Sequence, residues 1–311
     1  LKCSINPSHK YIVRVTAMNG NDKSFPGKGY ATLSVKKVDA PVATAATDVS
    51  TAGFTANWET SQYAANYKLT FVRTHTATAD GEALTYIDDD FLQIPYEMGT
   101  PEATIQSKDM KTPVSLDDLF KTPGWSTLLG IGFTGGFGIT NMYESYGLPG
   151  ALFGPVADFT IGEGKARISG TAMTLVDDAQ VKVGFGTLGA GNKITFNEGA
   201  KTIEISKAGS QFDVEVTGGS KDSRLIFQII DAAEGGDVVV FNNLKSSATL
   251  KKDDCYTLPH NVVTLPYDAT SYKMEIPFTG NDKFDYSLTG SFGDTVSPQS
   301  NTITVYSPEA T

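Results

Sequence analysis

The stretch YKLTFV (residues 67–72) alternates bulky apolar and polar residues, the period of a strand buried on one side. This alternation places Tyr67, Leu69 and Phe71 on one face. A second stretch, GFTANW (residues 53–58), precedes it and ends in Trp58. Two packed sheets need strands of this kind, each with one dry face. The two stretches together predict a β-sandwich.

Strand patterns continue along the chain, separated by turn signals at the spacing typical of sandwiches and barrels. Only SLDDLF (residues 115–120) predicts a short helix, with Ser115 as N-cap and Asp118 completing a capping box. Elsewhere we expect strands within residues 11–17, 165–172, 180–185, 202–205, 211–216, 224–230, 237–241, 272–276, 284–288 and 301–305. The sequence therefore predicts an all-β protein.

Composition excludes several classes of protein. The chain has 25 Lys and Arg against 35 Asp and Glu, a net charge of −10, and no basic stripe, which argues against a nucleic-acid partner. Hydrophobic residues make up 40 %, enough for real cores. No apolar run approaches the roughly 18 residues of a membrane span. The first residue is Leu1 and no signal-peptide pattern follows it, so we expect a processed or cut fragment.

Cysteine and histidine are scarce. Cys3 and Cys255 form no C-x-x-C motif, which excludes zinc-ribbon sites; we expect buried inert thiols, with a Cys3–Cys255 disulfide as the less favoured alternative. His9, His75 and His260 are scattered and are expected at the surface. The chain therefore offers too few histidines for us to expect a histidine-based nucleophilic triad.

A weak internal repeat links the two ends of the chain. The same order of predicted elements occurs twice, in residues 7–35 and in residues 284–305. Each segment has a strand, then a Gly-Asn or Gly-Asp hairpin region that ends in Ser, and then a second strand. Both segments are predicted to be the last two strands of one kind of domain.

These segments resemble fibronectin type III domains. NPSHKY (residues 6–11) is similar to the turn before the tyrosine-bearing strand, APV (residues 40–42) to the domain entry, and GFTANW to the strand with the core tryptophan. The closing half of this second copy follows only at about residues 258–306. The resemblance implies the C-terminal part of one domain in residues 1–38 and a second, split domain in residues 39–80 plus 256–311.

The insertion resembles jelly-roll modules, of cleaved-adhesin and galactose-binding-like types, in secreted Bacteroidetes surface proteins. The resemblance rests on IDDDF (87–91), PGW (123–125), GALFGPVADF (150–159) and GDVVVFNNL (236–244). It implies a jelly roll across residues 81–255, an extracellular or cell-surface location and a monomeric fragment. Such an insertion is tolerated because closure entropy grows slowly with loop length.

The run Asp88-Asp89-Asp90 is the strongest local charge cluster. Adjacent carboxylates repel one another, and Ca²⁺ would relieve that repulsion. In a strand only Asp88 and Asp90 share a face. The jelly-roll resemblance implies a structural calcium with Asn242, or its neighbour Asn243, as a further ligand. A solvated edge or loop run is the more usual alternative.

Aromatic residues near a glycine-rich stretch suggest a sugar site. Flat rings stack on sugar faces, and glycines allow close backbone approach. Trp125, Tyr143 and Tyr146 are the candidate ligand-binding residues. A core position for Trp125 is the alternative, whereas YESY (residues 143–146) reads as an exposed loop.

No pattern marks a catalytic site. Glycosidases need two carboxylates about 5–10 Å apart, and no spacing singles out a pair among Glu97, Glu102, Glu144 and Asp158. The leading hypothesis is a non-catalytic adhesion or ligand-binding segment of a larger secreted or surface protein. By resemblance, its partner is carbohydrate or a host glycoprotein. A structural spacer, and a jelly-roll glycoside hydrolase or the accessory region of a protease, are the alternatives.

Overall fold

The computed structural model describes residues 37–308, apart from 108, 110, 143–149, 232–236 and 277–280. Before residue 37 it places four two-residue strands: β1 (Arg14–Val15) pairs with β4 (Gly27–Lys28), and β2 (Met18–Asn19) with β3 (Asp22–Lys23). Most of the partial domain predicted in residues 1–38, with Cys3 and His9, lies outside the described residues.

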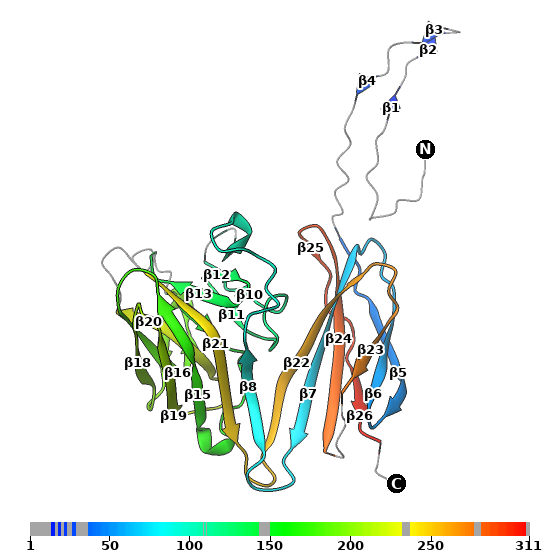
Figure 1. Cartoon of the computed structure of the whole chain (residues 1–311). Coiled ribbons are helices and arrows are strands. Elements are labelled where there is room, and N and C mark those ends of the chain that lie inside the picture. Colours follow the sequence, from blue (N-terminus) through cyan, green and yellow to red (C-terminus); the bar gives the residue numbers. More distant parts are fainter. Residues whose placement is uncertain are drawn as a thin grey trace. The chain divides into compact units, whose positions relative to one another are not determined.

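The all-β class is confirmed (Figure 1). Within the described residues the only helical elements are short 3-10 turns, namely η1 (Pro101–Ala103), η3 (Gly162–Gly164) and η4 (Ala190–Asn192). None of the helices in this part of the chain has the length and apolar character needed to cross a membrane. The chain divides into two compact units, and the boundary between them passes through β7, β22 and β24.

Unit 1 comprises residues 1–70, 263–278 and 285–308. One sheet has the order β23-β6-β5, from β23 (Ser271–Glu275), β6 (Gly53–Glu59) and β5 (Val42–Ser50). The other has the order β22-β7-β24-β25, with β26 also paired to β24. Its strands are β22 (Cys255–Pro266), β7 (Asn66–Thr76), β24 (Asp282–Phe292), β25 (Thr295–Val296) and β26 (Ile303–Tyr306).

The buried face of β7, which runs from unit 1 into unit 2 at Phe71, follows the sequence prediction. Tyr67, Leu69 and Phe71 are all fully buried along β7, so the predicted common face is confirmed. Trp58 of β6 is also buried and meets the ring of Tyr67 edge-on, with centroids 6.2 Å apart. Because β6 and β7 belong to different sheets, this contact closes a β-sandwich.

Unit 2 comprises residues 71–262, 279–284 and 309–311. Its first sheet has the order β10-β11-β14-β20-β16-β17, and β18 also pairs with β16. The strands are β10 (Val114–Ser115), β11 (Ser126–Thr127), β14 (Ala151–Phe153), β16 (Ala179–Leu188), β17 (Ile194–Phe196), β18 (Lys201–Ile205) and β20 (Arg224–Asp231).

The second sheet of unit 2 has the order β19-β15-β21-β13-β12-β9, and β8 also pairs with β21. The strands are β8 (Ala83–Asp89), β9 (Thr104–Gln106), β12 (Leu129–Phe133), β13 (Gly136–Thr140), β15 (Ala166–Thr174), β19 (Ser210–Val216) and β21 (Val238–Thr249). One continuous core joins the two sheets: it includes Phe185 and Phe227 of the first and Phe137 and Phe241 of the second, and the rings of Phe227 and Phe241 lie 5.7 Å apart.

The helix predicted in residues 115–120 is wrong. The backbone N–H groups of Leu119 and Phe120 both donate to the Leu116 carbonyl, which makes a single turn. The Ser115 hydroxyl does accept from the Asp117 N–H at 3.2 Å, as an N-cap would, but Ser115 itself pairs with Ser126 in the β10–β11 ladder and only one turn follows it. Leu116 and Phe120 are buried in the core, and this packing outweighs the local helix signal.

Candidate binding surface

Three strands of unit 2 present rows of polar side chains to solvent. In β15, Arg167, Ser169 and Thr171 point away from the core, whereas Ile168 between them is fully buried. Successive side chains of β19 and β21 likewise point alternately toward solvent and toward the core. We call the nine outward residues the polar face: Arg167, Ser169 and Thr171 of β15, Gln211, Asp213 and Glu215 of β19, and Asn243, Lys245 and Ser247 of β21.

Strand register aligns these residues in three rows. Gln211, Thr171 and Asn243 lie opposite one another across the three strands. The next row is Asp213, Ser169 and Lys245, and the third is Glu215, Arg167 and Ser247. Side chains directly opposite on one sheet face lie close enough to interact. The polar face is therefore a continuous hydrogen-bonding surface rather than a set of scattered residues.

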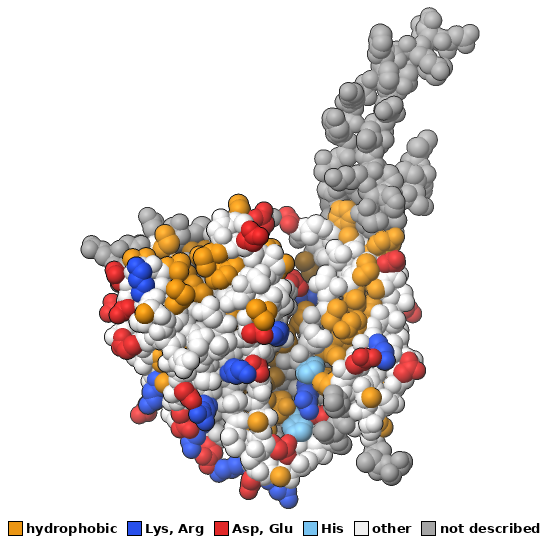
Figure 2. All heavy atoms as spheres, viewed as in Figure 1, with side chains coloured by type: hydrophobic (Ala, Val, Ile, Leu, Met, Phe, Trp, Pro, Cys, Tyr) orange, Lys and Arg blue, Asp and Glu red, His pale blue; other side chains and the backbone are white. Residues whose placement is uncertain are grey.

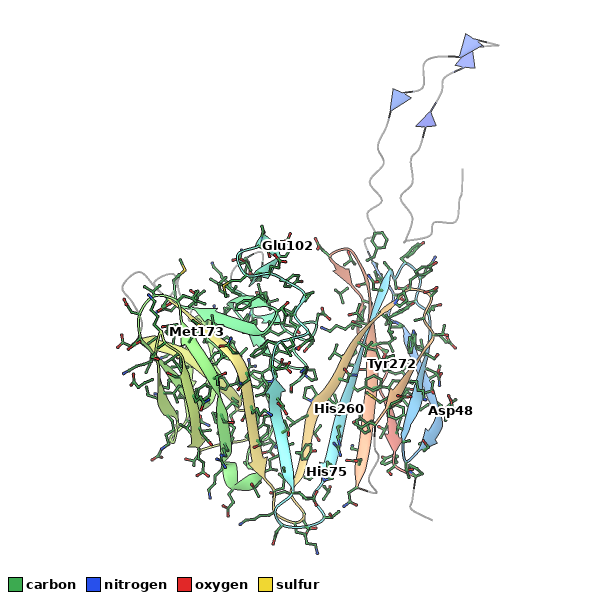
Figure 3. All side chains as sticks on the ribbon, in the orientation of Figure 1. Asp48, His75, Glu102, Met173, His260 and Tyr272 are labelled. Carbon is green, nitrogen blue, oxygen red and sulfur yellow. The ribbon has the colours of Figure 1, made fainter. Side chains whose placement is uncertain are left out.

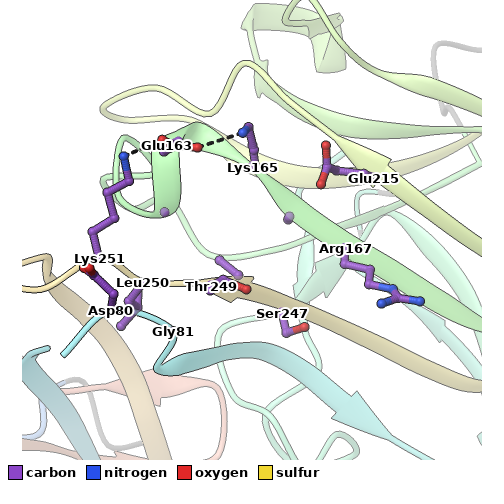
Figure 4. Close-up of a pocket in the computed structure, with 13 residues that line it drawn as sticks. Asp80, Gly81, Glu163, Lys165, Arg167, Glu215, Ser247, Thr249, Leu250 and Lys251 are labelled. Atoms are coloured by element: carbon purple, nitrogen blue, oxygen red, sulfur yellow. Dashed lines mark hydrogen bonds and ion pairs between the residues drawn. The ribbon is translucent and has the colours of Figure 1, made fainter.

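Two hollows lie on this surface. The smaller, of about 320 Å³, is lined mainly by the first two rows, together with Gly170 and Phe212. The larger, of about 810 Å³, adjoins the third row. It extends over the turn at residues 162–165 and the segments around Asp80 and Lys251 (Figure 4). Charged side chains of both signs are interspersed on the surface of the molecule (Figure 2).

Ion pairs neutralise the cations of this region. Arg167 donates two hydrogen bonds to Asp213, from Nε at 2.8 Å and from Nη2 at 2.5 Å. Lys245 lies 3.2 Å from Asp88 of β8. The Asn243 amide donates to the Thr171 hydroxyl at 2.9 Å. Within the described part of the chain, the side chains of Ser169 and Gln211 make no hydrogen bond to protein and remain available to a ligand.

Glu163 sits at the rim of the larger hollow between two lysines (Figure 4). Its carboxylate accepts from Lys165 at 2.7 Å and from Lys251 at 2.5 Å. These bonds lower the pKa of Glu163 to about 2. Glu163 adopts a left-handed conformation, φ 59°, which is unusual for a residue with a side chain. Gly162 and Gly164 on either side are also left-handed, so the turn projects the carboxylate toward both lysines.

Trp125 does not lie on this surface. It is 1 % exposed, donates through its indole N–H to the Tyr86 carbonyl at 3.3 Å and packs near Phe227. As placed, it is a core residue and offers no ring face to a ligand. The other two predicted sugar-binding residues, Tyr143 and Tyr146, lie outside the described residues, as does Glu144.

The residues predicted to bind calcium are separated by other contacts. Asp88 pairs with Lys245 and Asp90 with Lys121, whereas the Asn242 amide donates to the Gly135 carbonyl. Hydrogen bonding to Lys121 lowers the pKa of Asp90. No group of three or more His, Cys, Asp or Glu in the described ranges is arranged to hold a metal ion.

Two expectations about single residues are wrong. His75 is not a surface residue: it is 7 % exposed, because the buried face of β7 continues past Phe71 through Arg73 to His75. Extending the alternation of residues 67–71 by two steps would have found it. Cys255 is exposed rather than buried, since it begins β22 after the turn at residues 251–254.

His75 belongs to a polar cluster around the buried Asp282 carboxylate that the sequence did not predict. Its Nδ1 lies 2.7 Å from Asp282 and its Nε2 3.0 Å from Glu82. Arg73 binds Asp282 through two nitrogens at 2.9 and 3.0 Å. The side chain of Asp282 is fully buried, and no described serine or cysteine contacts the imidazole. The cluster therefore ties three chain segments together and is not a nucleophilic triad.

Comparison with known proteins identifies no family. No protein-family model matches the chain, and no curated protein matches it. Among solved structures, the CBM22-1 xylan-binding domain of Paenibacillus barcinonensis Xyn10C is similar at 10 % identity with a TM-score of 0.29, covering 56 % of this chain and 99 % of that domain. The tripod (BppUct-A-L) from the baseplate of bacteriophage Tuc2009 is similar at 9 % identity with a TM-score of 0.22, covering 78 % and 99 %. Likenesses at this level do not bear on function.

Proposed function

We propose that this chain is a non-catalytic, extracellular binding segment of a larger secreted or surface protein, and that its polar face binds neutral carbohydrate, either free or on a glycoprotein. The observation that carries the proposal is the polar face itself. Nine hydrogen-bonding side chains stand in register on three strands, and all of them except Lys245 line one of two open hollows.

Sugar hydroxyl groups both donate and accept hydrogen bonds, so they suit a surface of amide, hydroxyl and carboxylate groups. Ser169 and Gln211 supply such groups with no competing protein bond. Phe212 adds a half-buried apolar edge to the smaller hollow. An elongated glycan could follow β15 from Thr171 to Arg167 and contact both hollows.

The charge arrangement favours neutral over acidic sugars. Each cation that borders the hollows already has a carboxylate partner: Asp213 for Arg167, and Glu163 for Lys165 and Lys251. A ligand carboxylate or sulfate would compete with these partners and would also meet Asp80 and Glu215. The net charge of −10 adds a general repulsion.

The domain interpretation belongs to the same proposal. Residues 39–80 and 256–311 form a split fibronectin type III-like sandwich, and residues 81–255 form an inserted jelly roll. Pairing between β6 and β23 supports the split, because Asn57 and Ser271 are register partners although the insertion separates them in sequence.

A structural spacer is the second candidate. No described residue of the polar face is aromatic, and Trp125 is buried. Sugar sites often gain much of their affinity from ring stacking. A polar surface without such a ring also fits a module whose role is to stay soluble and separate.

A glycan array with the whole chain, followed by calorimetry on the best neutral ligand, tests the proposal. We expect Gln211→Ala and Asn243→Ala to weaken binding roughly tenfold each, the scale of a lost hydrogen bond in a formed site. Lys273→Ala removes an exposed residue of unit 1 and serves as the matched control. If no neutral glycan on the array binds, the spacer is favoured. Release of shortened sugars from any ligand would contradict a non-catalytic role.

A further inference from the structure

The outer face of the second sheet of unit 2 changes from polar to apolar beyond the first row of the polar face. Met173 stands near the end of β15 (Figure 3). It points the same way as Thr171, because the residue between them packs into the core. Met173 lies opposite Val240 of β21. Val240 in turn lies opposite Gly138 of β13, which pairs with Ile131 of β12. The polar face therefore continues directly into an apolar row.

Phe133 of β12 lies on the same outer face, two residues beyond Ile131 and opposite Gly136 of β13. Its ring occupies the space that the missing Gly136 side chain leaves. A Cβ at Gly136 would lie 2.5 and 2.6 Å from two ring carbons of Phe133, and 3.2 Å from Cγ1 of Val240. The ring therefore extends from β12 across β13 toward Val240, which is the register partner of Met173.

We call Ile131, Phe133, Met173 and Val240 the apolar platform. Hydrophobic side chains gather on this face over β12 and β13 (Figure 2). Val240 is buried, whereas the other three side chains are half-buried and present part of their apolar surface to solvent. Three half-buried side chains offer far less than the roughly 800 Å² that each partner contributes to a stable protein interface. The platform therefore suits a small apolar surface, such as one face of a sugar ring.

Sugar rings whose hydroxyl groups are all equatorial are amphipathic. Their hydroxyl groups point outward around the rim, and both ring faces carry C–H groups. The face of an aromatic ring is negative and attracts the weakly positive C–H groups. The polarizable thioether of Met173 adapts to the shape of such a face. A sugar that stacks on Phe133 keeps its rim hydroxyl groups free for hydrogen bonds with polar neighbours.

We propose that the apolar platform is the stacking subsite of the polar face, and that the ligand is a neutral chain of β-linked sugars with equatorial hydroxyl groups, such as β-1,4-linked glucose or xylose. The inference rests on the proposed function, since it requires the polar face to bind carbohydrate. One sugar ring stacks on Phe133 beside Met173. The next units follow β15, where Thr171 and Ser169 bond to their hydroxyl groups.

The length of this path sets the size of the ligand. Met173 and Arg167 are six residues apart on β15, which corresponds to about 20 Å at the usual rise of about 3.3 Å per residue. Several linked sugars are needed to cover that distance. A long oligosaccharide is therefore the appropriate probe.

The alternative is that Phe133 only stabilises the sheet. Aromatic side chains often cover a glycine on a neighbouring strand, because the ring shields the exposed backbone. Such a role predicts a loss of stability on substitution but no change in the affinity of the folded protein for a ligand. Binding measurements on folded variants therefore separate the two roles.

Calorimetry of the whole chain with the β-1,4-linked hexasaccharides of glucose and of xylose is the direct test. We expect at least one of them to bind, and Phe133→Leu to weaken that binding roughly tenfold, the scale of one lost aromatic contact. Phe196→Leu is the matched control, because it removes a half-buried ring from β17 of the other sheet. It should bind as the parent chain does. Circular dichroism confirms that both variants are folded.

Tryptophan fluorescence supplies a second readout that does not depend on a loss of binding. Trp58 and Trp125 are 3 % and 1 % exposed, so their emission should not respond to a ligand at the platform. Phe133→Trp places a larger ring there. We expect its emission to change as the bound hexasaccharide saturates the site, whereas the emission of the parent chain stays constant. If Phe133→Leu does not fold, this variant alone decides.

The outcomes separate this inference from the proposed function. If Gln211→Ala weakens hexasaccharide binding but Phe133→Leu does not, the platform is not a subsite, although the polar face still binds sugar. If neither hexasaccharide binds, the inference is overturned, and the glycan array decides independently whether the polar face binds another neutral glycan. Conversion of a dimer of the chain into a monomer by Phe133→Leu would show that the platform is an interface between copies and would also overturn the inference.

Discussion

Arg167 on β15 and Asp213 on β19 form a two-point ion pair across neighbouring strands, and the two residues line different hollows. They are not direct register partners, because Arg167 lies opposite Glu215 and Asp213 opposite Ser169. The pair therefore crosses the surface diagonally and separates the smaller hollow from the larger. It also leaves Glu215 beside the larger hollow, which keeps that region from attracting anions.

Asp213→Asn tests whether the Arg167–Asp213 pair keeps anionic ligands from binding to this surface. The substitution preserves side-chain size but leaves the Arg167 guanidinium without its carboxylate partner. We expect the affinity for a carboxylated oligosaccharide, relative to its neutral counterpart, to rise roughly tenfold. Calorimetry with the two ligands measures this ratio. The Tm should change little, because exposed ion pairs contribute little to stability.

A matched control separates this local effect from net charge. Glu275→Gln frees Lys273 on β23 of unit 1 and changes the net charge by the same amount. It should leave the ratio of the two affinities unaltered. An equal rise in both variants would show that overall charge, and not the Arg167–Asp213 pair, sets the preference.

Calcium binding has an equally direct measurement. Lys245 and Lys121 already neutralise Asp88 and Asp90, and buried Asp89 accepts from the Phe91 and Lys121 N–H groups. We therefore expect the same Tm in chelator and in millimolar Ca²⁺. A rise in Tm that grows with Ca²⁺ concentration would instead support the calcium site predicted from the sequence.

The sequence was sufficient for features that depend on local alternation. The common face of Tyr67, Leu69 and Phe71 and the all-β class follow from a period of two, which any buried strand imposes. The same rule, applied two residues further, would have placed Arg73 and His75 on the buried face. Arg73 and His75 are polar, so the alternation of apolar residues in the sequence does not extend to them.

The polar face could not be predicted from local patterns. Arg167, Glu215 and Ser247 form one row only because β19 and β21 pair with β15 in one particular register. Alternation within one strand shows which residues share a face, but it does not show which strand becomes the neighbour or at which residue the two strands align. The helix predicted at residues 115–120 failed for a related reason, since burial of Leu116 and Phe120 overrode the capping signal.

Trp125→Ala should destabilise unit 2. Its indole is buried among the core residues of unit 2, so the substitution would leave a large cavity. We expect the free energy of unfolding of unit 2 to fall by about 3–5 kcal/mol. Chemical denaturation followed by circular dichroism measures this change. A loss below about 1 kcal/mol would contradict the core placement and would restore Trp125 as a candidate ligand-binding residue.

Gly170→Ala probes the floor of the smaller hollow. A Cβ at this position would lie 2.4 Å from the Asn243 carbonyl oxygen and 2.9 Å from the Phe212 ring, so β15 and β21 would have to separate. We expect a loss of about 1–3 kcal/mol in the free energy of unfolding, because backbone atoms cannot move aside as a flexible side chain would. Gly189→Ala is the control: its φ is −91°, and its nearest neighbour lies 3.5 Å from the added carbon. Equal stability of the two variants, measured by chemical denaturation, would show that the strands beneath the hollow are not packed this closely.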